Sequence, residues 1–160
     1  MSKVYEIRQL SEVFYSEYDE EKYPEMERKK DRPYIVILVK IGKNTFAIPF
    51  RTNMKHDACY KFKNSGRKTK NETGLDFSKA VVVNEKKYIG KKVLIDWMEF
   101  LEIEQRYFFI ISKFRRYISN YNRYLNGELK ERDAQKYKYT TLKYFHKELG
   151  IDSEWLLLTI

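Results

Sequence analysis

Two apolar runs rich in β-branched and aromatic residues dominate the first half of the sequence. They span residues 34–41 and 45–50, and Gly42-Lys43-Asn44 connects them. A short connection with Gly and Asn between such runs is typical of a β-hairpin. The first run is apolar at nearly every position, which predicts a strand buried on both faces. Pro49 is expected to end regular pairing, and a polar cluster, residues 51–56, follows directly. The pattern therefore predicts a hairpin that presents polar side chains at its exit.

The other residues up to about 95 predict shorter elements. Further short strands are expected at 3–9, 58–63 and 80–83 from their apolar and alternating patterns. Ser11 can cap a helix that begins there, and Gly90 is a candidate turn residue. We expect this half of the chain to form a compact, twisted antiparallel sheet or a small barrel.

The period of the pattern changes near residue 96. Apolar residues then recur at helical spacing, namely Trp97, Leu101, Phe108, Ile111, Ile118 and Leu125, flanked by Tyr107, Phe114, Tyr117 and Tyr121. This predicts a helix of about 25–30 residues that ends at Gly127. A second helix is expected over 132–149. The sequence thus predicts an α+β fold in one domain, residues 1–160, with about 1–95 mainly sheet and about 96–160 mainly helical.

The positive charge is concentrated around the hairpin. The chain carries a net charge of +9, and residues 28–70 hold 13 Lys and Arg against 2 Asp and Glu. Such a local excess is a candidate footprint for a polyanion, and the alternative is a basic surface that only keeps the protein in solution. The 14 Tyr and 10 Phe favour single-stranded nucleic acid, because exposed rings among basic groups stack bases.

Basic residues in several segments are candidates for contact with RNA. They lie in the loop before the hairpin, on the strand at 58–63, in the loop after it, near residue 88 and on the long helix. The candidates are Arg28, Lys29, Lys30, Lys61, Lys63, Arg67, Lys68, Lys87, Tyr88, Arg115 and Arg116.

Several classes of chemistry have no signal in the sequence. The chain has one cysteine, Cys59, and two histidines, His56 and His146, so it has no zinc-finger spacing and no internal disulfide. It also has no Gly-rich phosphate loop and no spaced carboxylate set typical of metal-dependent nucleases. We expect no metal and no other cofactor. No segment reads as a signal peptide or a membrane span, which predicts a soluble, cytoplasmic protein.

With metal and cofactor chemistry set aside, the candidate chemistry is that of cationic and hydroxyl side chains. Cleavage of RNA without a metal needs a base for the 2′-OH, donors that stabilise the phosphorane and an acid for the departing 5′-oxygen. The polar cluster and the start of the hairpin contain suitable residue types: Arg32, Arg51, Thr52, Asn53, Lys55 and His56. A polar loop after a strand also commonly holds such residues without any catalytic role, and that alternative stays open.

Three blocks occur in order along the chain: Arg-Pro-Tyr-Ile-Val-Ile-Leu-Val at 32–39, Phe-Ala-Ile-Pro-Phe-Arg-Thr-Asn-Met-Lys-His at 46–56, and Gly-Leu-Asp-Phe-Ser-Lys-Ala-Val at 74–81. Together they resemble the toxins of type III toxin–antitoxin systems, the ToxN/AbiQ endoribonucleases, and most closely the CptN/TenpN branch. The resemblance implies a barrel-like fold similar to the Kid/MazF toxins, extended by helices. It also implies metal-independent cleavage of single-stranded RNA to a 2′,3′-cyclic phosphate and a 5′-OH.

The same resemblance implies a partner and a biological role. Members of the family process a repetitive RNA antitoxin, whose pseudoknotted units inhibit them in closed RNA–protein assemblies. Such systems act in phage defence by abortive infection, or in plasmid maintenance.

Carried over by position, the family's hydroxyl-then-lysine element falls on Thr52 and Lys55, and its basic residue at the start of the hairpin falls on Arg32. The sequence departs from ToxN in reading Arg51-Thr52 for a Thr-Ser pair and Arg32 for a lysine. Arginine is a poor proton donor, so we expect Arg32 to stabilise charge. Histidine titrates near neutrality, so His56 joins Lys55 as a candidate for proton transfer.

Two other hypotheses remain open for the sequence. One is a non-catalytic RNA- or DNA-binding module that uses the same basic face, with Tyr60, Phe62 and Tyr88 as stacking groups. The other is a structural or protein-interaction domain built on the long helix, which predicts no salt-dependent affinity for RNA.

Overall fold

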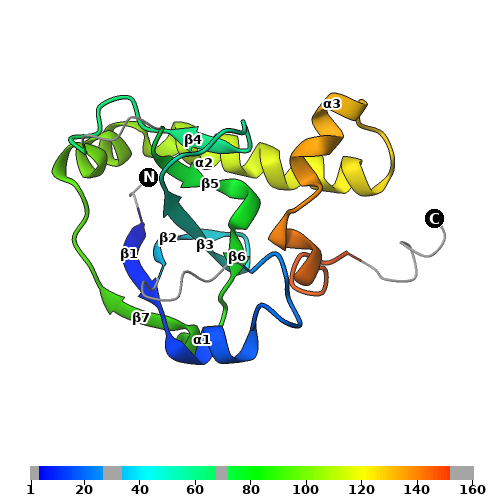
Figure 1. The fold of residues 1–160 in the computed structure, drawn as a ribbon, viewed down its shortest axis with the longest axis horizontal. Helices are drawn as coiled ribbons and strands as arrows, with labels where there is room; N and C mark the ends of the chain where they lie inside the picture. The colour runs from blue at the N-terminus through cyan, green and yellow to red at the C-terminus, as the bar shows by residue number, and fades with distance from the viewer. Residues whose placement is uncertain (1–3, 27–33, 68–71, 152–160) are drawn as a thin grey trace.

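The computed structural model describes residues 4–26, 34–67 and 72–151. An antiparallel sheet packs against one long helix, and the short helices that follow it in the chain lie near its C-terminal end (Figure 1). The strands are β1 Tyr5–Leu10, β2 Ile35–Ile41, β3 Asn44–Arg51, β4 Cys59–Lys61, β5 Gly74–Asp76, β6 Val81–Val82 and β7 Ile89–Lys92. The helices are α1 Glu12–Glu17, α2 Trp97–Leu125 and α3 Glu131–Ala134, with 3-10 turns η1 Phe77–Lys79, η2 Lys86–Tyr88, η3 Gln135–Tyr137 and η4 Thr141–Tyr144. The predicted α+β class is confirmed.

The predicted hairpin is formed by β2 and β3. The two strands pair from Val36 opposite Pro49 to Ile41 opposite Asn44. Gly42 in the two-residue turn has φ +61°, a left-handed conformation that costs glycine little. Residues 36–39 are all buried, so β2 is covered on both faces, as its continuous apolar run predicts.

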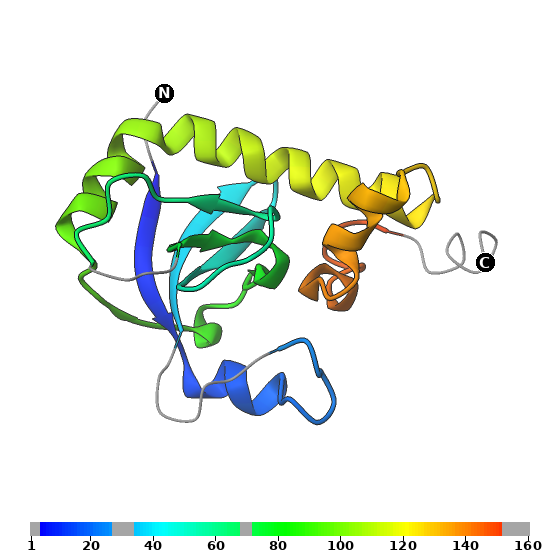
Figure 2. The same cartoon turned by 45° about the horizontal axis from the view of Figure 1, so that its top comes forward.

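The sheet stays open. Its order is β4-β5-β3-β2-β1-β7, with β6 beside β3, and β4 and β7 lie at its two ends. Among the described strands, none pairs β4 with β7, so the expectation of a small barrel is wrong. The apolar inner face is covered instead by α2, which crosses it (Figure 2). There the ring of Phe114 on α2 lies 5.2 Å from that of Phe46 on β3.

Pro49 marks a change of partner within β3. The pairing of β3 with β2 ends at Pro49, as expected, but the strand itself continues to Arg51. Before Pro49, the outer edge of β3 pairs with β6 at Phe46 and Ala47, and after it the same edge pairs with β5 at Phe50 and Arg51. Proline has no N–H to donate, so it fits the point where one partner strand gives way to the next.

The first strand and helix follow the prediction, whereas Gly90 does not. Ser11 caps α1, and its Oγ accepts a hydrogen bond from the N–H of Phe14 at 3.3 Å. Gly90 lies inside β7 and not in a turn. A Cβ at this position would stand 2.8 Å from the carbonyl oxygen of Gln9, so the close approach of β7 to β1 explains the glycine.

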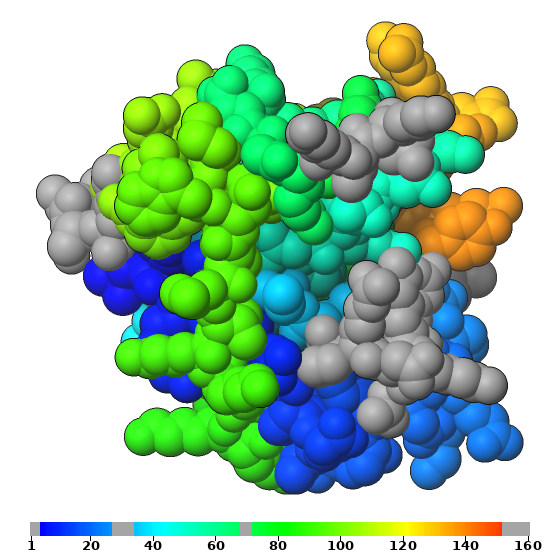
Figure 3. All heavy atoms as spheres, turned by 60° about the vertical axis from the view of Figure 1, so that its left-hand side comes forward, coloured from blue at the N-terminus to red at the C-terminus, as the bar shows by residue number. Residues whose placement is uncertain are grey.

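The long helix is confirmed, but its buried face differs from the predicted stripe. Asp96 caps α2, which runs for 29 residues. Trp97 and Phe108 are 65% and 48% exposed. The start of α2 and the segment before it lie at the surface (Figure 3). The core instead receives Glu99, Glu102, Ile103, Tyr107, Ile110, Phe114, Tyr117 and Tyr121. Tyrosine can lie in this core because its hydroxyl group forms a hydrogen bond there. The hydroxyl of Tyr117, for example, donates to Thr140 Oγ1.

The helix expected over 132–149 is wrong. The structure has the three short pieces α3, η3 and η4 in its place. Contacts with the rest of the fold override the helical spacing, because Thr140 Oγ1 caps η4 by accepting from the N–H of Leu142. In addition, the hydroxyl of Thr141 donates to the carbonyl of Ala80, and the hydroxyl of Tyr137 donates to the carbonyl of Tyr117. The apolar segment at 152–160 lies outside the described residues.

Candidate functional site

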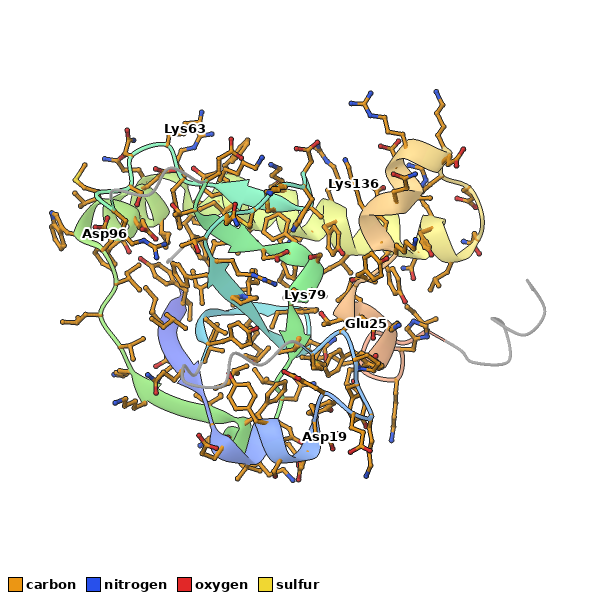
Figure 4. All side chains as sticks on the ribbon, in the orientation of Figure 1. Asp19, Glu25, Lys63, Lys79, Asp96 and Lys136 are labelled. Atoms are coloured by element: carbon orange, nitrogen blue, oxygen red, sulfur yellow. The ribbon has the colours of Figure 1, made fainter. Side chains whose placement is uncertain are left out.

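A cleft of about 590 Å³ opens where β3 ends. Four segments that are distant in sequence form its walls: 24–25, 51–56, 76–79 and 135–139. Figure 4 labels one residue in three of them, Glu25, Lys79 and Lys136. Its lining consists of Pro24, Glu25, Arg51, Thr52, Asn53, Met54, Lys55, His56, Asp76, Ser78, Lys79, Gln135, Lys136 and Tyr139. The cleft thus contains five of the six predicted catalytic residues.

The last residue of β3, Arg51, and the loop that follows it present these five residues. Asn53 has φ +59°, a conformation that asparagine tolerates better than most residues. The side chain of Met54 is buried, and its backbone N–H donates to the carbonyl of Glu72 at 3.2 Å. Met54 therefore fastens the loop, while its neighbours Thr52 and Lys55 are exposed to the cleft.

A buried carboxylate, Asp76, lies beneath the cleft at the end of β5. It is 2% exposed, and its Oδ1 accepts from the backbone N–H of Ser78 at 3.0 Å and from the hydroxyl of Ser78 at 2.6 Å. His56 Nε2 lies 3.3 Å from Oδ1, and Arg51 Nη1 lies 3.5 Å from Oδ2. Burial opposes ionisation of Asp76, but the hydrogen bonds from His56 and Ser78 and the charge of Arg51 outweigh it. The pKa of Asp76 is therefore below its ordinary value of 3.8.

Both ring nitrogens of His56 have partners. The backbone N–H of Ala58 donates to Nδ1 at 3.2 Å, so Nδ1 must carry a lone pair. The proton of the ring then sits on Nε2, where it points at Asp76. The thiol of Cys59 also donates to the carbonyl of His56 at 3.1 Å. The hydrogen bonds therefore hold His56 in one orientation and one tautomer at the wall of the cleft.

Several predicted residues lie outside the described part of the chain. These are Arg32 of the catalytic set and Arg28, Lys29, Lys30 and Lys68 of the RNA-binding set.

The other predicted RNA-binding residues do not line the cleft. Lys61 Nζ lies 2.5 Å from Glu72, and Arg67 Nε lies 2.5 Å from the buried carboxylate of Glu99. Both contacts attach these cations to the fold, because each partner comes from a distant segment. Lys61 and Lys63 also line a hollow beside the cleft.

On the far side of the sheet, Lys87 and Tyr88 both bind Glu17 of α1, at 3.0 and 2.5 Å. The predicted stacking group Tyr60 is buried and donates its hydroxyl to Glu102, so it offers no face to a base. On α2, Arg115 and Arg116 are both exposed, but only Arg116 borders one of the hollows described below.

The sequence pattern missed much of the cleft. Asp76 could have been found as a charge within an apolar strand pattern, Gly74-Leu-Asp-Phe, since such a residue needs a buried partner. Lys136 and Tyr139 had no such signal, because the short helices that bring them to the cleft depend on tertiary contacts.

Within residues 4–26, 34–67 and 72–151, no three His, Cys, Asp or Glu side chains are grouped as metal ligands. No helix in those ranges combines the length and apolar character that a membrane span requires. Comparison of the chain with protein-family models, curated proteins and solved structures gives no match.

Proposed function

We propose that this chain is an endoribonuclease that cleaves single-stranded RNA without a metal ion, by attack of a 2′-OH on the adjacent phosphate. The products are a 2′,3′-cyclic phosphate and a 5′-OH. We further propose that it is the cytoplasmic toxin of a type III toxin–antitoxin system, which processes a repetitive RNA antitoxin and is inhibited by it. One observation carries the proposal: Arg51, Thr52, Lys55 and His56 line a single cleft, and a buried Asp76 holds two of them.

The cleft has the groups that a phosphorane requires. Arg51, Lys55, Lys79 and Lys136 supply positive charge around it. Cations attract the phosphate before reaction and stabilise the charge that builds on its oxygens during reaction. Thr52 adds a hydroxyl at the exposed end of the loop. This combination favours transesterification of RNA over chemistry that begins with a side-chain nucleophile.

Lys55 and His56 differ in what they can do with a proton. The ammonium group of Lys55 has protons to give and is exposed in the cleft, so it is our candidate for the acid that protonates the 5′-oxygen. His56 has no free lone pair while Nδ1 accepts from Ala58. In this arrangement His56 acts as a positioning residue, because its Nε2–H binds the carboxylate that also holds Arg51.

The first test is cleavage of single-stranded RNA in EDTA. The wild-type protein is expected to leave a 2′,3′-cyclic phosphate, and Lys55→Ala is expected to lower the rate by about 10²–10⁴-fold. Lys86→Ala removes an exposed lysine that does not line the cleft, and it should cleave like the wild type. If the wild type binds RNA but leaves it intact, the non-catalytic RNA-binding module is the better account.

The role of His56 has a test of its own. The amide of His56→Gln can still donate to Asp76, whereas His56→Ala cannot. A positioning role predicts that His56→Gln keeps more activity than His56→Ala and keeps the wild-type pH–rate profile. Equal loss in both variants, with one limb of the profile removed, would instead show that His56 transfers a proton.

The toxin role is tested in cells. Expression of the wild-type chain should arrest bacterial growth, and Lys55→Ala should not. The DNA upstream of the gene should carry short tandem repeats whose transcript restores growth. Cleavage in vitro without growth arrest would leave a ribonuclease that is not a toxin.

A further inference from the structure

The long helix carries a polar stripe beside its buried face. The stripe is spaced by three and four residues and consists of Arg106, Phe109, Lys113, Arg116, Asn120 and Arg123. Each of the first five members directly precedes a buried residue of α2, such as Tyr107 or Phe114. Successive helical residues are about 100° apart, so the stripe runs along the border of the core for about 26 Å. We call these six residues the α2 stripe; four of them are cations and none is acidic.

Two hollows lie along the α2 stripe. One, of about 410 Å³, lies between α2 and the segment around α3, where Arg116 and Arg123 face Lys130. The other, of about 430 Å³, lies between α2 and β4, where Arg106 and Phe109 face Lys61 and Lys63. Lys113 borders both hollows.

Lys136 joins these hollows to the cleft. It borders the hollow beside α3, the hollow beside β4 and the cleft itself. The three spaces therefore meet at one side chain, and a ligand strand that leaves the cleft past Lys136 enters the groove along the α2 stripe.

The charge of this groove suits a polyanion. The hollow beside β4 is lined by five cations and one carboxylate, and the hollow beside α3 by five cations and three carboxylates. Two of those carboxylates make long contacts to groove cations, Arg123 with Glu128 at 3.7 Å and Lys136 with Asp133 at 3.8 Å. Exposed pairs of this kind contribute little, so a phosphate can take the place of the carboxylate.

Phe109 adds an aromatic surface to the cations. Its side chain is 51% exposed, and the guanidinium of Arg106 lies 4.3 Å from the centre of its ring. The ring of Tyr60 meets it edge-on at 6.2 Å and holds it in place. An exposed ring with a stacked guanidinium, set among lysines, is how single-stranded nucleic acid is bound through its bases.

We propose that the α2 stripe binds the part of a single-stranded RNA that extends beyond the cleft. Lys113, Arg116 and Arg123 contact its phosphates, and Phe109 stacks one of its bases. The identity of the ligand rests on the proposed function, but binding along the stripe does not require that the cleft be catalytic.

Binding of 2′-O-methyl RNA tests this inference, because such RNA lacks the attacking hydroxyl and stays intact. Strands of about 4 and about 16 nucleotides span the size range of single-strand sites. The variant is Lys113→Ala/Arg116→Ala/Arg123→Ala. The control is Lys40→Ala/Lys86→Ala/Lys91→Ala, which removes three exposed cations that border neither the cleft nor the two hollows. Affinity is measured by fluorescence anisotropy over a range of salt concentrations.

The stripe variant is expected to bind the long strand at least about ten-fold more weakly. The slope of log affinity against log salt should become shallower by about 2, since each lost phosphate contact contributes about 0.7. The short strand, held in the cleft, should bind as it does to the wild type, and the control should match the wild type for both strands. Phe109→Ala should also weaken the long strand, and Phe109→Tyr should restore it.

Other outcomes overturn the inference and separate it from the proposed function. Equal losses in the stripe and control variants would mean that diffuse charge attracts the RNA, and unchanged binding of the stripe variant would mean that the groove is not used. Either result leaves cleavage by the wild type, and thus the proposed function, intact. If the wild type fails to cleave RNA while the stripe variant selectively loses the long strand, the inference stands and the proposed function fails.

Discussion

Buried carboxylates occur in two regions of this molecule, and their roles differ. Beneath the cleft, Asp76 binds His56 and Arg51. At the start of α2, Glu102 accepts from the hydroxyl of Tyr60 at 2.5 Å and from the N–H groups of Lys63 and Asn64 at 2.9 and 2.8 Å. Both side chains are less than 4% exposed, so burial alone does not tell them apart.

The partners make the difference. The side chains of His56 and Arg51 are 41% and 22% exposed, and both line the cleft. The partners of Glu102 are backbone groups and a buried phenol, which have no such open side. Glu102 therefore fastens a loop to a helix, whereas Asp76 fixes the orientation of groups that a ligand can reach. A buried carboxylate is informative about function when its partners still have an accessible side.

The largest effect on stability is expected from Glu102→Ala. It leaves two backbone N–H groups and the hydroxyl of Tyr60 without their acceptor, which should lower the free energy of unfolding by about 3–5 kcal/mol. Urea unfolding measures the change, with the exposed Glu128→Ala as a control within about 0.5 kcal/mol. Cleavage per folded molecule should not change. A specific loss of cleavage would break the distinction between the two carboxylates.

Asp76→Asn is expected to lower stability less than Glu102→Ala does and to lower cleavage more. The amide keeps the shape but not the charge, and the side chains of His56 and Arg51 can turn to water, so the loss of stability should be about 1–3 kcal/mol. Cleavage should fall by at least about ten-fold, equivalent to about 1.4 kcal/mol of transition-state stabilisation, because both groups lose their fixed orientation. Measuring kcat and KM separately shows where the loss lies. Cleavage at the wild-type rate would remove Asp76 from the site.

The pH dependence of stability separates the charge of Asp76 from its shape. Because the pKa of Asp76 is lower in the folded state, its ionised form contributes stability that is fully present above its ordinary pKa of 3.8. That contribution is lost as the pH falls through the lower folded value. The difference in stability between the wild type and Asp76→Asn should therefore shrink as the pH falls below about 4. A difference that already shrinks near neutrality would mean that another group is responsible.

The smallest effect on stability is expected from Lys61→Ala. The side chains of Lys61 and Glu72 are 34% and 60% exposed, so loss of their ion pair should cost less than about 1 kcal/mol. Affinity for the long 2′-O-methyl strand should still fall, since Lys61 borders the hollow beside β4. Thermal unfolding and anisotropy measure the two effects on one sample. A large drop in stability with unchanged affinity would assign Lys61 to the fold alone.

The parts of the fold that local sequence determines were predictable. The hairpin follows from a glycine turn between two apolar runs, and α2 follows from a helical period sustained over many turns. The segment at 132–149 has the same kind of period, but the side-chain hydrogen bonds of Thr140 and Tyr137 break it into short pieces. Periodicity shows that a segment has an apolar face, but it does not show which tertiary contacts end a helix.

The residues of the candidate site also fall into two groups, those that could be predicted from the sequence and those that could not. Residues 51–56 are contiguous in sequence, so their clustering could be predicted from the chain alone. Asp76 and Lys136 reach the same cleft only through the topology of the fold. Conversely, Arg67 was predicted to bind RNA, but its guanidinium pairs with Glu99, 32 residues further along the chain. A local count of charge cannot show which cations have already found a carboxylate.

The positions of the cleft walls in the sequence also determine at which stage of synthesis the cleft can form. Residues 51–56 supply one wall, whereas Gln135, Lys136 and Tyr139 supply another. During synthesis the ribosome releases the first wall some eighty residues before the second. A nascent chain that has already formed its hairpin therefore still lacks a complete cleft. If the protein cleaves RNA, the order of translation delays that activity until the segment that holds Lys136 has been made.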